Sequence, residues 1–459
     1  MTPDANDLCV FAVKRGDIES RIDTNYSRPQ YIELVHSLRK RFGDILKPLG
    51  TIADVICGPF GSAIKNTDYR ESGIPLVRIT NITKEGYMSY DDLVYISDEL
   101  GNSLARTQVV AGDIVISQRG SLGQCAIVDN TFEKLNISAN IIAIKNIRES
   151  SVSFIHDYLL STVGQALLDR SISGQVQQKI TTQDIAGILI PVGCDETYLS
   201  GILMEGYKSF NNKRKQANEL LRDFDNKLSN KYTLLTKDNK KLCFAVLYKE
   251  IDGVLDAKRY STIKHEASHS SNISNVCVIV DNKVNVLQYG EQLVDWIRID
   301  DLPNQPLGIE VIRTQPANEI EGPFFEVQED DILVARLGPT ILNQKIVMVH
   351  SLKRTTIASA EFLVLRCKPG YEPEAVMAIL KTAYYRDLMY SKARGSTPSR
   401  YRLNREDALK LPFPDIRESQ DTLAAEALRV RDEVLKLRRE AVEEWERAKE
   451  QFEKALLGK

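Results

Sequence analysis

The sequence predicts a mixed α/β protein made of two similar halves, each of which ends in a long helix. At 459 residues the chain is too long for one ordinary hydrophobic core. Blocks of the first half recur in the same order in the second half, and an apolar heptad pattern closes each half. We therefore expect two mixed α/β domains in a pseudo-twofold repeat, separated by two long antiparallel coiled-coil-like helices. The expected boundaries are residues 1–196 and 236–416 for the domains and 197–235 and 417–459 for the helices.

The internal repeat consists of five pairs of segments. They are FAVKRGDIESRIDTNY (11–26) with FAVLYKEIDGVLDAKRY (244–260), GIPLVRITNI (73–82) with QLVDWIRIDDL (292–302), AGDIVISQRGSLGQCAIV (111–128) with EDDILVARLGPTILNQKIVMV (329–349), DYLLSTVGQALLDRSISG (157–174) with AVMAILKTAYYRDLMYSKARG (375–395), and the closing AGILIPV with ALKLPFP. A preserved order of five blocks indicates a duplicated domain.

Local patterns within the first half predict both strands and helices. DIVIS and CAIVD are short apolar runs between glycine-rich turns, which is typical of paired strands. Residues 154–170 carry apolar side chains at helical spacing and place Arg170 near the end. We expect a helix over 154–170.

The closing segments carry the strongest pattern in the chain, an apolar residue at alternating intervals of three and four. Such a seam is typical of helices that pack along each other, and we expect the two helices to pack together. Arg214 is the exception that a shifted register or an acidic partner must accommodate. The seam positions are Leu203, Tyr207, Phe210, Arg214, Ala217, Leu221, Phe224 and Leu228, then Leu423, Ala427, Val430, Val434, Leu437, Ala441, Trp445, Ala448, Phe452 and Leu456.

Composition excludes several classes of protein. Apolar residues make up 43% and charged residues 27% of the chain, which is typical of a globular protein. We expect no signal peptide, because the N-terminal MTPDANDLCVF lacks a basic region followed by an apolar run, and no membrane segment, because no stretch reaches about 18 apolar residues. The seven cysteines are scattered without a CxxC, so we expect reduced thiols and a cytoplasmic location. A net charge of −3 leaves room only for a local basic face.

Catalytic motifs do not fit their surroundings. HEASH (265–269) matches HExxH, but its serine- and asparagine-rich flanks do not favour the helix that zinc ligation needs. The glycine-rich GPFGSAIKN (58–66) and QRGSLGQ (118–124) lack the GK[ST] of a phosphate-binding loop. The sequence therefore favours a chain without a catalytic site, a metal or a cofactor of its own.

Two loops at equivalent places of the repeat carry different polar chemistry. KARGSTPSRYRLNR (392–405) has five basic residues and no acid, whereas SGQVQQK (173–179) is rich in glutamine. Arginine suits phosphates and the guanine edge of the major groove, and glutamine suits the adenine edge. The pair indicates two surfaces that read different nucleic-acid sequences.

These features together resemble the specificity subunit of type I restriction–modification systems. IESRIDTNYSRP, GPFGSAIKNTDY, GIPLVRITNI and AGDIVISQRGSLGQCAIV in order, followed by the polar loop, AGILIPV and a long helix, carry the resemblance over nearly the whole chain. The second half departs from it, since it has no PFGS and its ARLGPTILNQK is longer.

The resemblance implies a non-catalytic subunit that recognises double-stranded DNA. Each domain would be a target-recognition domain for one half of a bipartite sequence, and the helices would dock two methyltransferase subunits that bind S-adenosylmethionine and methylate adenine. Restriction translocase–nuclease subunits, which use ATP and Mg²⁺, would join for cleavage.

Matching the loops of the two halves gives candidate DNA contacts. In the first half they are Ser62, Lys65, Arg78, Asn81, Gln118, Arg119, Gln175, Gln177, Gln178 and Lys179, and in the second half Arg298, Arg336, Lys345, Arg394, Ser396, Arg400 and Arg402. The candidate partner-binding positions on the helices are Leu203, Tyr207, Phe210, Leu221, Phe224, Leu423, Val430, Val434, Leu437, Trp445 and Phe452.

Three alternatives remain open from the sequence. A specificity subunit of a type II-like or other phage-defence methyltransferase complex would look the same. A coiled-coil interaction scaffold would not bind duplex DNA in a salt-dependent way. A zinc hydrolase would require HEASH to form a metal site.

Overall fold

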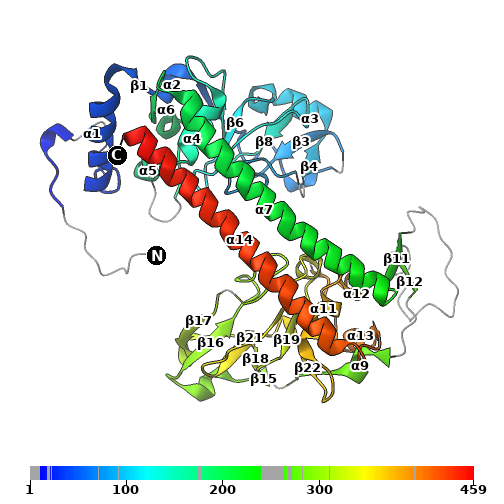
Figure 1. Cartoon of the computed structure of the whole chain (residues 1–459). Helices are drawn as coiled ribbons and strands as arrows, with labels where there is room; N and C mark the ends of the chain where they lie inside the picture. Colours follow the sequence, from blue (N-terminus) through cyan, green and yellow to red (C-terminus); the bar gives the residue numbers. More distant parts are fainter. Residues whose placement is uncertain are drawn as a thin grey trace. The chain divides into compact units, whose positions relative to one another are not determined.

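The computed structural model describes residues 11–17, 21, 23–70, 72–90, 93–173, 178–238, 263–266, 271–281, 283–309, 311–395 and 400–458. The chain divides into two compact units (Figure 1). Unit 1 comprises Met1–Asn212 with Glu440–Lys459, and unit 2 comprises Lys213–Arg439. Two long helices, α7 (Glu196–Lys231) and α14 (Gln420–Leu457), contribute residues to both units.

Unit 1 contains two four-stranded sheets. The first has the order β2-β9-β6-β7 and is antiparallel throughout, with strands Asp54–Cys57, Ile141–Lys145, Ile114–Ser117 and Cys125–Ile127. The second has the order β4-β3-β8-β5 and one parallel pair, β3·β8, with strands Val94–Ile96, Ile74–Val77, Leu135–Ile137 and Gln108–Val109. A further pair joins β1 (Leu46–Pro48) to β10 (Leu189–Pro191). The apolar run of β6 is buried along its whole length, which is why it reads as continuous rather than alternating.

The helices of unit 1 correct one prediction. They are α1 (Pro29–Phe42), α2 (Leu49–Ile52), α3 (Asp98–Ser103), α4 (Val152–Leu160), α5 (Thr162–Ser171) and α6 (Thr182–Ala186). The single helix expected over 154–170 is thus two helices that meet at Ser161. Ser161 has extended backbone, and its Oγ accepts the N–H of Gly164 at 3.1 Å, so it is the N-cap of α5. Apolar spacing continues across the break and hides it.

Unit 2 repeats this topology. Its first sheet has the order β14-β22-β19-β20, with strands Cys277–Ile279, Phe362–Cys367, Ile332–Ala335 and Ile346–Met348. Its second sheet has the order β15-β18-β21-β16-β17, with strands Lys283–Val284, Phe324–Val327, Thr356–Ser359, Leu293–Ile297 and Arg313–Pro316. The parallel pair is β16·β21, so β17-β16-β21-β18 corresponds to β4-β3-β8-β5, and β15 is an addition. The duplication predicted from the sequence is therefore present in the strand order.

Most of the remaining elements of unit 2 follow the order of their counterparts in unit 1. The pair β13 (Ser271–Asn272) and β23 (Pro412–Phe413) corresponds to β1 and β10. The helices are α9 (Ile273–Val276), α10 (Gly338–Leu342), α11 (Pro373–Leu380), α12 (Ala383–Lys392) and α13 (Arg405–Leu409). Strands β11 (Leu235–Asp238) and β12 (Ile263–Glu266) form a separate pair.

A buried ion pair recurs at the same place in both units. Asp113 lies 3.9 Å from the Lys145 Nζ in unit 1, and Asp331 accepts two hydrogen bonds of 2.8 Å from Arg366 in unit 2. Both aspartates precede the central strand of the first sheet, and both cations lie near the end of the strand beside it. The repeat thus extends from topology to individual side chains.

The long helices pack against each other with antiparallel direction. In unit 1 Ser209 donates to Glu444, and in unit 2 Lys227 donates to Glu426 at 2.6 Å. The residue numbers of α7 therefore increase in the direction in which those of α14 decrease. Gly206 faces Ala448 so closely that a Cβ at Gly206 would lie 2.3 Å from the Ala448 Cβ.

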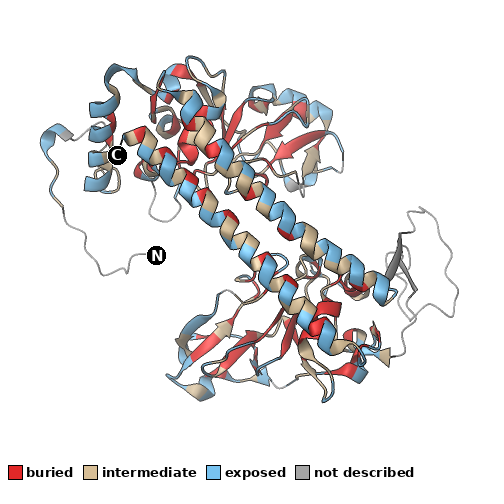
Figure 2. Cartoon of the chain, viewed as in Figure 1, coloured by how far each residue is buried: buried red, intermediate tan, exposed pale blue. Residues whose placement is uncertain are grey.

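The predicted seam is largely buried (Figure 2). The buried seam residues are Leu203, Phe210, Ala217, Leu228, Leu423, Val430, Val434, Ala441, Trp445, Ala448, Phe452 and Leu456. Arg214 lies exposed, so the seam leaves the cation at the surface. The predicted fold class, two mixed α/β domains with two long helices packed together, is confirmed. Among the described residues, no helix combines the length and the apolar character that crossing a membrane would need.

Candidate nucleic-acid interface

In unit 1 the predicted polar residues gather where strand β6 ends. The Gln118 N–H donates to the Asn140 carbonyl at 2.8 Å, and the Gln118 carbonyl accepts the N–H of Ile180 at 3.2 Å. Ser173 and Lys179 exchange two backbone hydrogen bonds, at 3.2 and 3.0 Å. Three segments that are distant in the sequence are therefore fixed side by side. We call the arrangement of Gln118, Asn140 and Lys179 the unit 1 frame.

The GPFGS loop borders this frame. The Gly58 N–H donates to the Ile141 carbonyl at 2.8 Å, and a Cβ at Gly58 would lie 2.1 Å from the Ser138 carbonyl oxygen, so only glycine fits. Beyond it Phe60 is 90% exposed, an unusual position for a large apolar side chain. A cavity of about 380 Å³ opens beside the loop, lined by Pro59, Phe60, Arg78, Thr80, Ser138 and Asn140 among others. Ser62 and Lys65 are exposed on the same loop.

Arg119 and Cys57 define the chemistry next to Gln118. Among the described residues, the Arg119 Nε is buried without a hydrogen-bond acceptor, and no acid pairs with this guanidinium. The Cys57 Sγ lies 3.8 Å from the Gln118 Oε1, and burial raises the pKa of the Cys57 thiol. The thiol therefore stays protonated at neutral pH and is a poor nucleophile.

One predicted contact of unit 1, Asn81, is enclosed by the fold. Asn81 is 0% exposed, its Oδ1 accepts the N–H of Arg78 at 2.9 Å, and its Nδ2 donates to the Ser89 carbonyl at 3.0 Å. A ligand cannot reach this amide, and we leave Asn81 out of the surface proposed below. Gln178 and Lys179 are exposed, whereas Gln175 and Gln177 lie outside the described residues.

Unit 2 builds the same backbone arrangement with different side chains. The Arg336 N–H donates to the Glu361 carbonyl at 3.1 Å, and the Arg336 carbonyl accepts the N–H of Leu403 at 2.9 Å. Arg394 and Arg402 exchange two backbone hydrogen bonds, at 3.0 and 2.8 Å. Arg336, Glu361 and Arg402 thus occupy the positions of Gln118, Asn140 and Lys179. We call them the unit 2 frame.

Most predicted cations of unit 2 have partners within the unit. Arg402 pairs with Glu361 at 2.7 Å, Arg394 with Asp407 at 2.9 Å and Arg298 with Asp300 at 3.2 Å. Arg298 also stacks over the Trp296 ring at 5.1 Å, and the Lys345 Nζ donates to the Ile299 carbonyl at 3.1 Å. Arg400 is exposed, and Ser396 lies outside the described residues.

Asn140 and Glu361, which complete the two frames, are not among the contacts predicted from the sequence. A signal was present, because both follow the same dipeptide before a buried strand. The segments are Ser138-Ala139-Asn140 and Ser359-Ala360-Glu361. Three residues are too short a match to stand out without the register of the strands.

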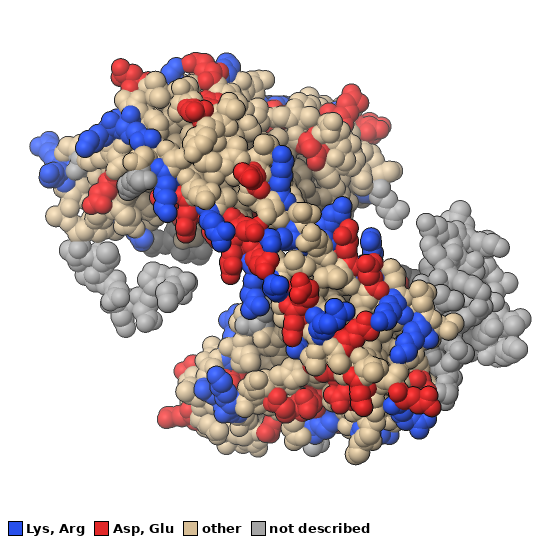
Figure 3. Space-filling model, in the orientation of Figure 1, with Lys and Arg blue, Asp and Glu red and all other residues tan. Residues whose placement is uncertain are grey.

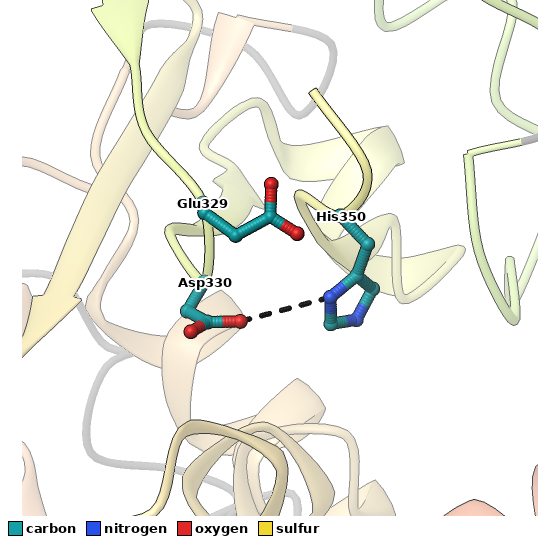
Figure 4. Close-up of side chains that lie close together, drawn as sticks. All are labelled: Glu329, Asp330 and His350. Carbon is teal, nitrogen blue, oxygen red and sulfur yellow. Dashed lines mark ion pairs between the residues drawn. The ribbon is translucent and has the colours of Figure 1, made fainter. Parts of the chain in front are cut away.

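A cluster of possible metal ligands proves to join two loops instead. Glu329, Asp330 and His350 lie together (Figure 4). Both Glu329 carboxylate oxygens accept backbone N–H groups, from Ser351 at 2.6 Å and Leu352 at 3.1 Å, and these bonds hold the pKa of Glu329 below its usual range. Asp330 pairs with His350 at 3.7 Å. The cluster is exposed, and its oxygens already have partners.

The HEASH motif does not form the helix that a zinc protease needs. His265 and Glu266 lie in strand β12, and the rest of the motif lies outside the described residues. The HExxH chemistry needs two histidines that lie four residues apart on one face of a helix. A strand does not provide this arrangement.

Charges of both signs alternate on the long helices. On the face seen in Figure 3, acidic and basic side chains lie interleaved over α7 and α14. Lys227 with Glu426 is one such pair, and Lys215 with Glu219 is another. The face of the helices seen in Figure 3 therefore does not resemble a phosphate-binding surface, which would be mainly basic.

No family model and no curated protein matches the chain. Among solved structures, it is similar to the S subunit of a type I restriction–modification system from M. genitalium, with 11% identity over 90% of this chain and 95% of that chain and a TM-score of 0.37. It is similar to a chain from a structural study of the assembly and conformational transition of the type I system, with 14% identity, coverage of 89% and 97% and a TM-score of 0.40. It is also similar to the HsdS subunit from Thermoanaerobacter tengcongensis, with 14% identity, coverage of 90% and 95% and a TM-score of 0.30. These values describe a loose likeness of fold.

Proposed function

We propose that this chain is the DNA-recognition subunit of a type I restriction–modification complex. Each mixed α/β domain reads one half of a bipartite double-stranded target, and the chain itself is non-catalytic and cytoplasmic. The domains extend over residues 1–196 and 236–416 in this proposal, and the segments 197–235 and 417–459 contain the spacer helices α7 and α14.

One observation carries this proposal, the two frames. The same backbone hydrogen bonds hold Gln118, Asn140 and Lys179 in unit 1 and Arg336, Glu361 and Arg402 in unit 2. Amides, guanidinium groups and carboxylates are the side chains that discriminate base edges in the major groove. A duplicated scaffold with exchanged side chains at one place is what two different half-sites require.

The other polar residues predicted from the sequence complete the proposed surface. In unit 1 these are Ser62, Lys65, Arg78, Arg119, Gln175, Gln177 and Gln178, and in unit 2 Arg298, Lys345, Arg394, Ser396 and Arg400. Cations on phosphates would position each domain, and amides and some arginines would read bases.

The helices serve as the docking elements for two methyltransferase subunits in this proposal. Because the seam residues are buried between α7 and α14, the partners would contact the outer, charged faces rather than the seam itself. S-adenosylmethionine would belong to the methyltransferase, and ATP and Mg²⁺ to the translocase–nuclease subunits.

Duplex binding at varied salt tests the proposal. We expect the full chain with its methyltransferase partner to bind duplex DNA with an affinity that falls steeply as salt rises. Lys179→Ala should weaken binding about equally for all sequences and reduce the slope of log affinity against log salt by about 1. Lys40→Ala, which changes an exposed lysine on α1 of the same unit, is the matched control and should leave the slope unchanged. Salt-independent binding, or none, would favour the scaffold alternative.

A further inference from the structure

We propose that Asn140 and Glu361 are specificity-determining residues at one equivalent position of the two domains. Glu361, held beside Arg402, would read a G·C pair by accepting a hydrogen bond from the N4 amino group of cytosine. This inference rests on the proposed function and names which position of each frame discriminates bases.

The position of Glu361 is fixed by its backbone. Its carbonyl accepts the N–H of Arg336, and it comes directly before the buried strand β22. Asn140 stands in the same relation to Gln118 and to strand β9. A side chain that is anchored through its own backbone and the adjacent strand can present its polar atoms with the accuracy that base readout needs.

The charge of Glu361 argues against a role on the DNA backbone. Phosphates would repel a carboxylate, so contact with the DNA backbone does not explain a glutamate among arginines at a DNA-binding surface. Cytosine N4 is the one base-edge group in the major groove for which a carboxylate is the ordinary partner.

The atoms of the unit 2 frame leave bonding capacity for a ligand. The Arg402 Nη2 donates to the Glu361 Oε1 at 2.7 Å, and the two side chains are 52% and 35% exposed. Within the described part of the chain, the Glu361 Oε2 and the Arg336 Nε are buried and have no hydrogen-bond partner, so turning either half-exposed side chain toward a base would break no internal hydrogen bond at these atoms. An arginine and a carboxylate side by side match the guanine acceptors and the cytosine donor of one base pair.

Asn140 offers different chemistry at the same place. It is exposed, lines the cavity beside Phe60, and its amide carries both a donor and an acceptor. An asparagine or glutamine amide pairs with the N6 and N7 atoms of adenine. The exchange of asparagine for glutamate therefore predicts a different preferred base in the two half-sites.

Selection from randomised duplexes tests this assignment. The full chain with its methyltransferase partner would be compared with Glu361→Gln, Glu361→Ala and Asn140→Ala. We expect each Glu361 variant to lower the preference for G·C at one position of one half-site by roughly 10- to 100-fold. Asn140→Ala should relax one position of the other half-site.

Asp415→Asn is the matched control, because Asp415 pairs with Arg417 at 2.6 Å in the same unit but outside the frame. It should leave every preference unchanged, and melting curves of all variants should confirm folding. A fall in affinity with unchanged base preferences would mean that Glu361 only positions Arg402, and would overturn the inference. So would effects of Asn140 and Glu361 variants on the same half-site. If the wild-type complex selects no bipartite sequence, the proposed function itself fails.

Discussion

The two units place different side chains on one backbone arrangement. Unit 1 presents amides and an exposed lysine at the end of its central strand, whereas unit 2 presents two arginines and a glutamate. The strand order, the buried aspartate–cation pair and the helix caps are shared. Stability is therefore supplied by the common parts, which leaves the frame positions open to variation.

A second difference lies next to the frames. Unit 1 has the GPFGS loop with its exposed Phe60, whereas unit 2 passes from β14 almost directly into the additional strand β15. Within the described residues, this exposed aromatic side chain has no counterpart at the equivalent place of unit 2.

The helix seam should tolerate truncation least in unit 1. Phe210 is 2% exposed, and its ring centroid lies 6.4 Å from that of Trp445. The seam of unit 2 has no fully buried aromatic ring among its described residues, because Phe224 is only half-buried and the buried positions are Ala217, Leu228, Leu423, Val430 and Val434. Phe210→Ala should lower the free energy of unfolding by about 3–5 kcal/mol. Hydrogen exchange should show the greater loss of protection in unit 1, and Val434→Ala should cause a smaller loss, centred on unit 2. A loss below about 1 kcal/mol for Phe210→Ala would contradict the packing described.

Removing the exposed aromatic ring should separate binding from stability. Phe60→Ala should leave the free energy of unfolding unchanged but weaken duplex binding by about 1–3 kcal/mol, because an exposed ring can stack on bases or wedge between them. Fluorescence anisotropy measures the affinity, and Leu287→Ala removes an exposed apolar side chain of unit 2 as the control. Equal affinity of Phe60→Ala and wild type would mean that the loop does not touch DNA.

A buried lysine should make the stability of unit 2 depend on pH. Burial lowers the pKa of Lys381 to about 8, and its Nζ donates to the carbonyls of Pro306 and Ile346. The corresponding residue of unit 1, before the N-cap Ser161, is Leu160. An unfolded lysine titrates near 10.4. Between about pH 8 and pH 10 the unfolded chain holds a proton that the folded chain has released, so stability rises with pH.

Urea unfolding measures this effect. Relative to Lys381→Met, the free energy of unfolding of the wild type should rise by roughly 1 kcal/mol per pH unit across that window. Parallel pH profiles of the two proteins would show that folding does not lower the pKa of Lys381.

The smallest effect concerns a residue with positive φ. Asp330 has a φ of +65° and donates its N–H to the Val349 carbonyl, where unit 1 has Gly112 with a φ of +93° and the same bond to Val128. Asp330→Gly should therefore raise the free energy of unfolding by up to about 1 kcal/mol, since the exposed pair with His350 contributes little. Asp330→Ala should not raise it, and thermal melting of both variants decides the point.

Much of the fold could be predicted because its signals are local. The buried run of β6 and the seam from Leu203 to Leu228 each depend on residues close in sequence, and the repeat supplied the second copy of each. The break at Ser161 was missed because apolar spacing continues across it and a serine N-cap has no exclusive sequence signal.

The candidate site was predicted only in part, because its contacts are long-range. Arg402 could be recognised as part of a basic loop, but its partner Glu361 lies 41 residues earlier in the sequence. The sequence predicts that Asn81 contacts DNA, but in the structure the turn around Arg78 and Ser89 encloses its amide. Strand register decides which polar residues are exposed, and the composition of a loop does not reveal that register.

Sequencing of methylated bases tests the central claim most directly. In DNA from a host that expresses this chain with its methyltransferase partner, we expect methylated adenine within an asymmetric, bipartite sequence with a gap of fixed length. Arg402→Ala should relax one half of that sequence and leave the other half intact. A continuous motif, methylation that does not depend on this chain, or an equal effect of Arg402→Ala on both halves would contradict the account.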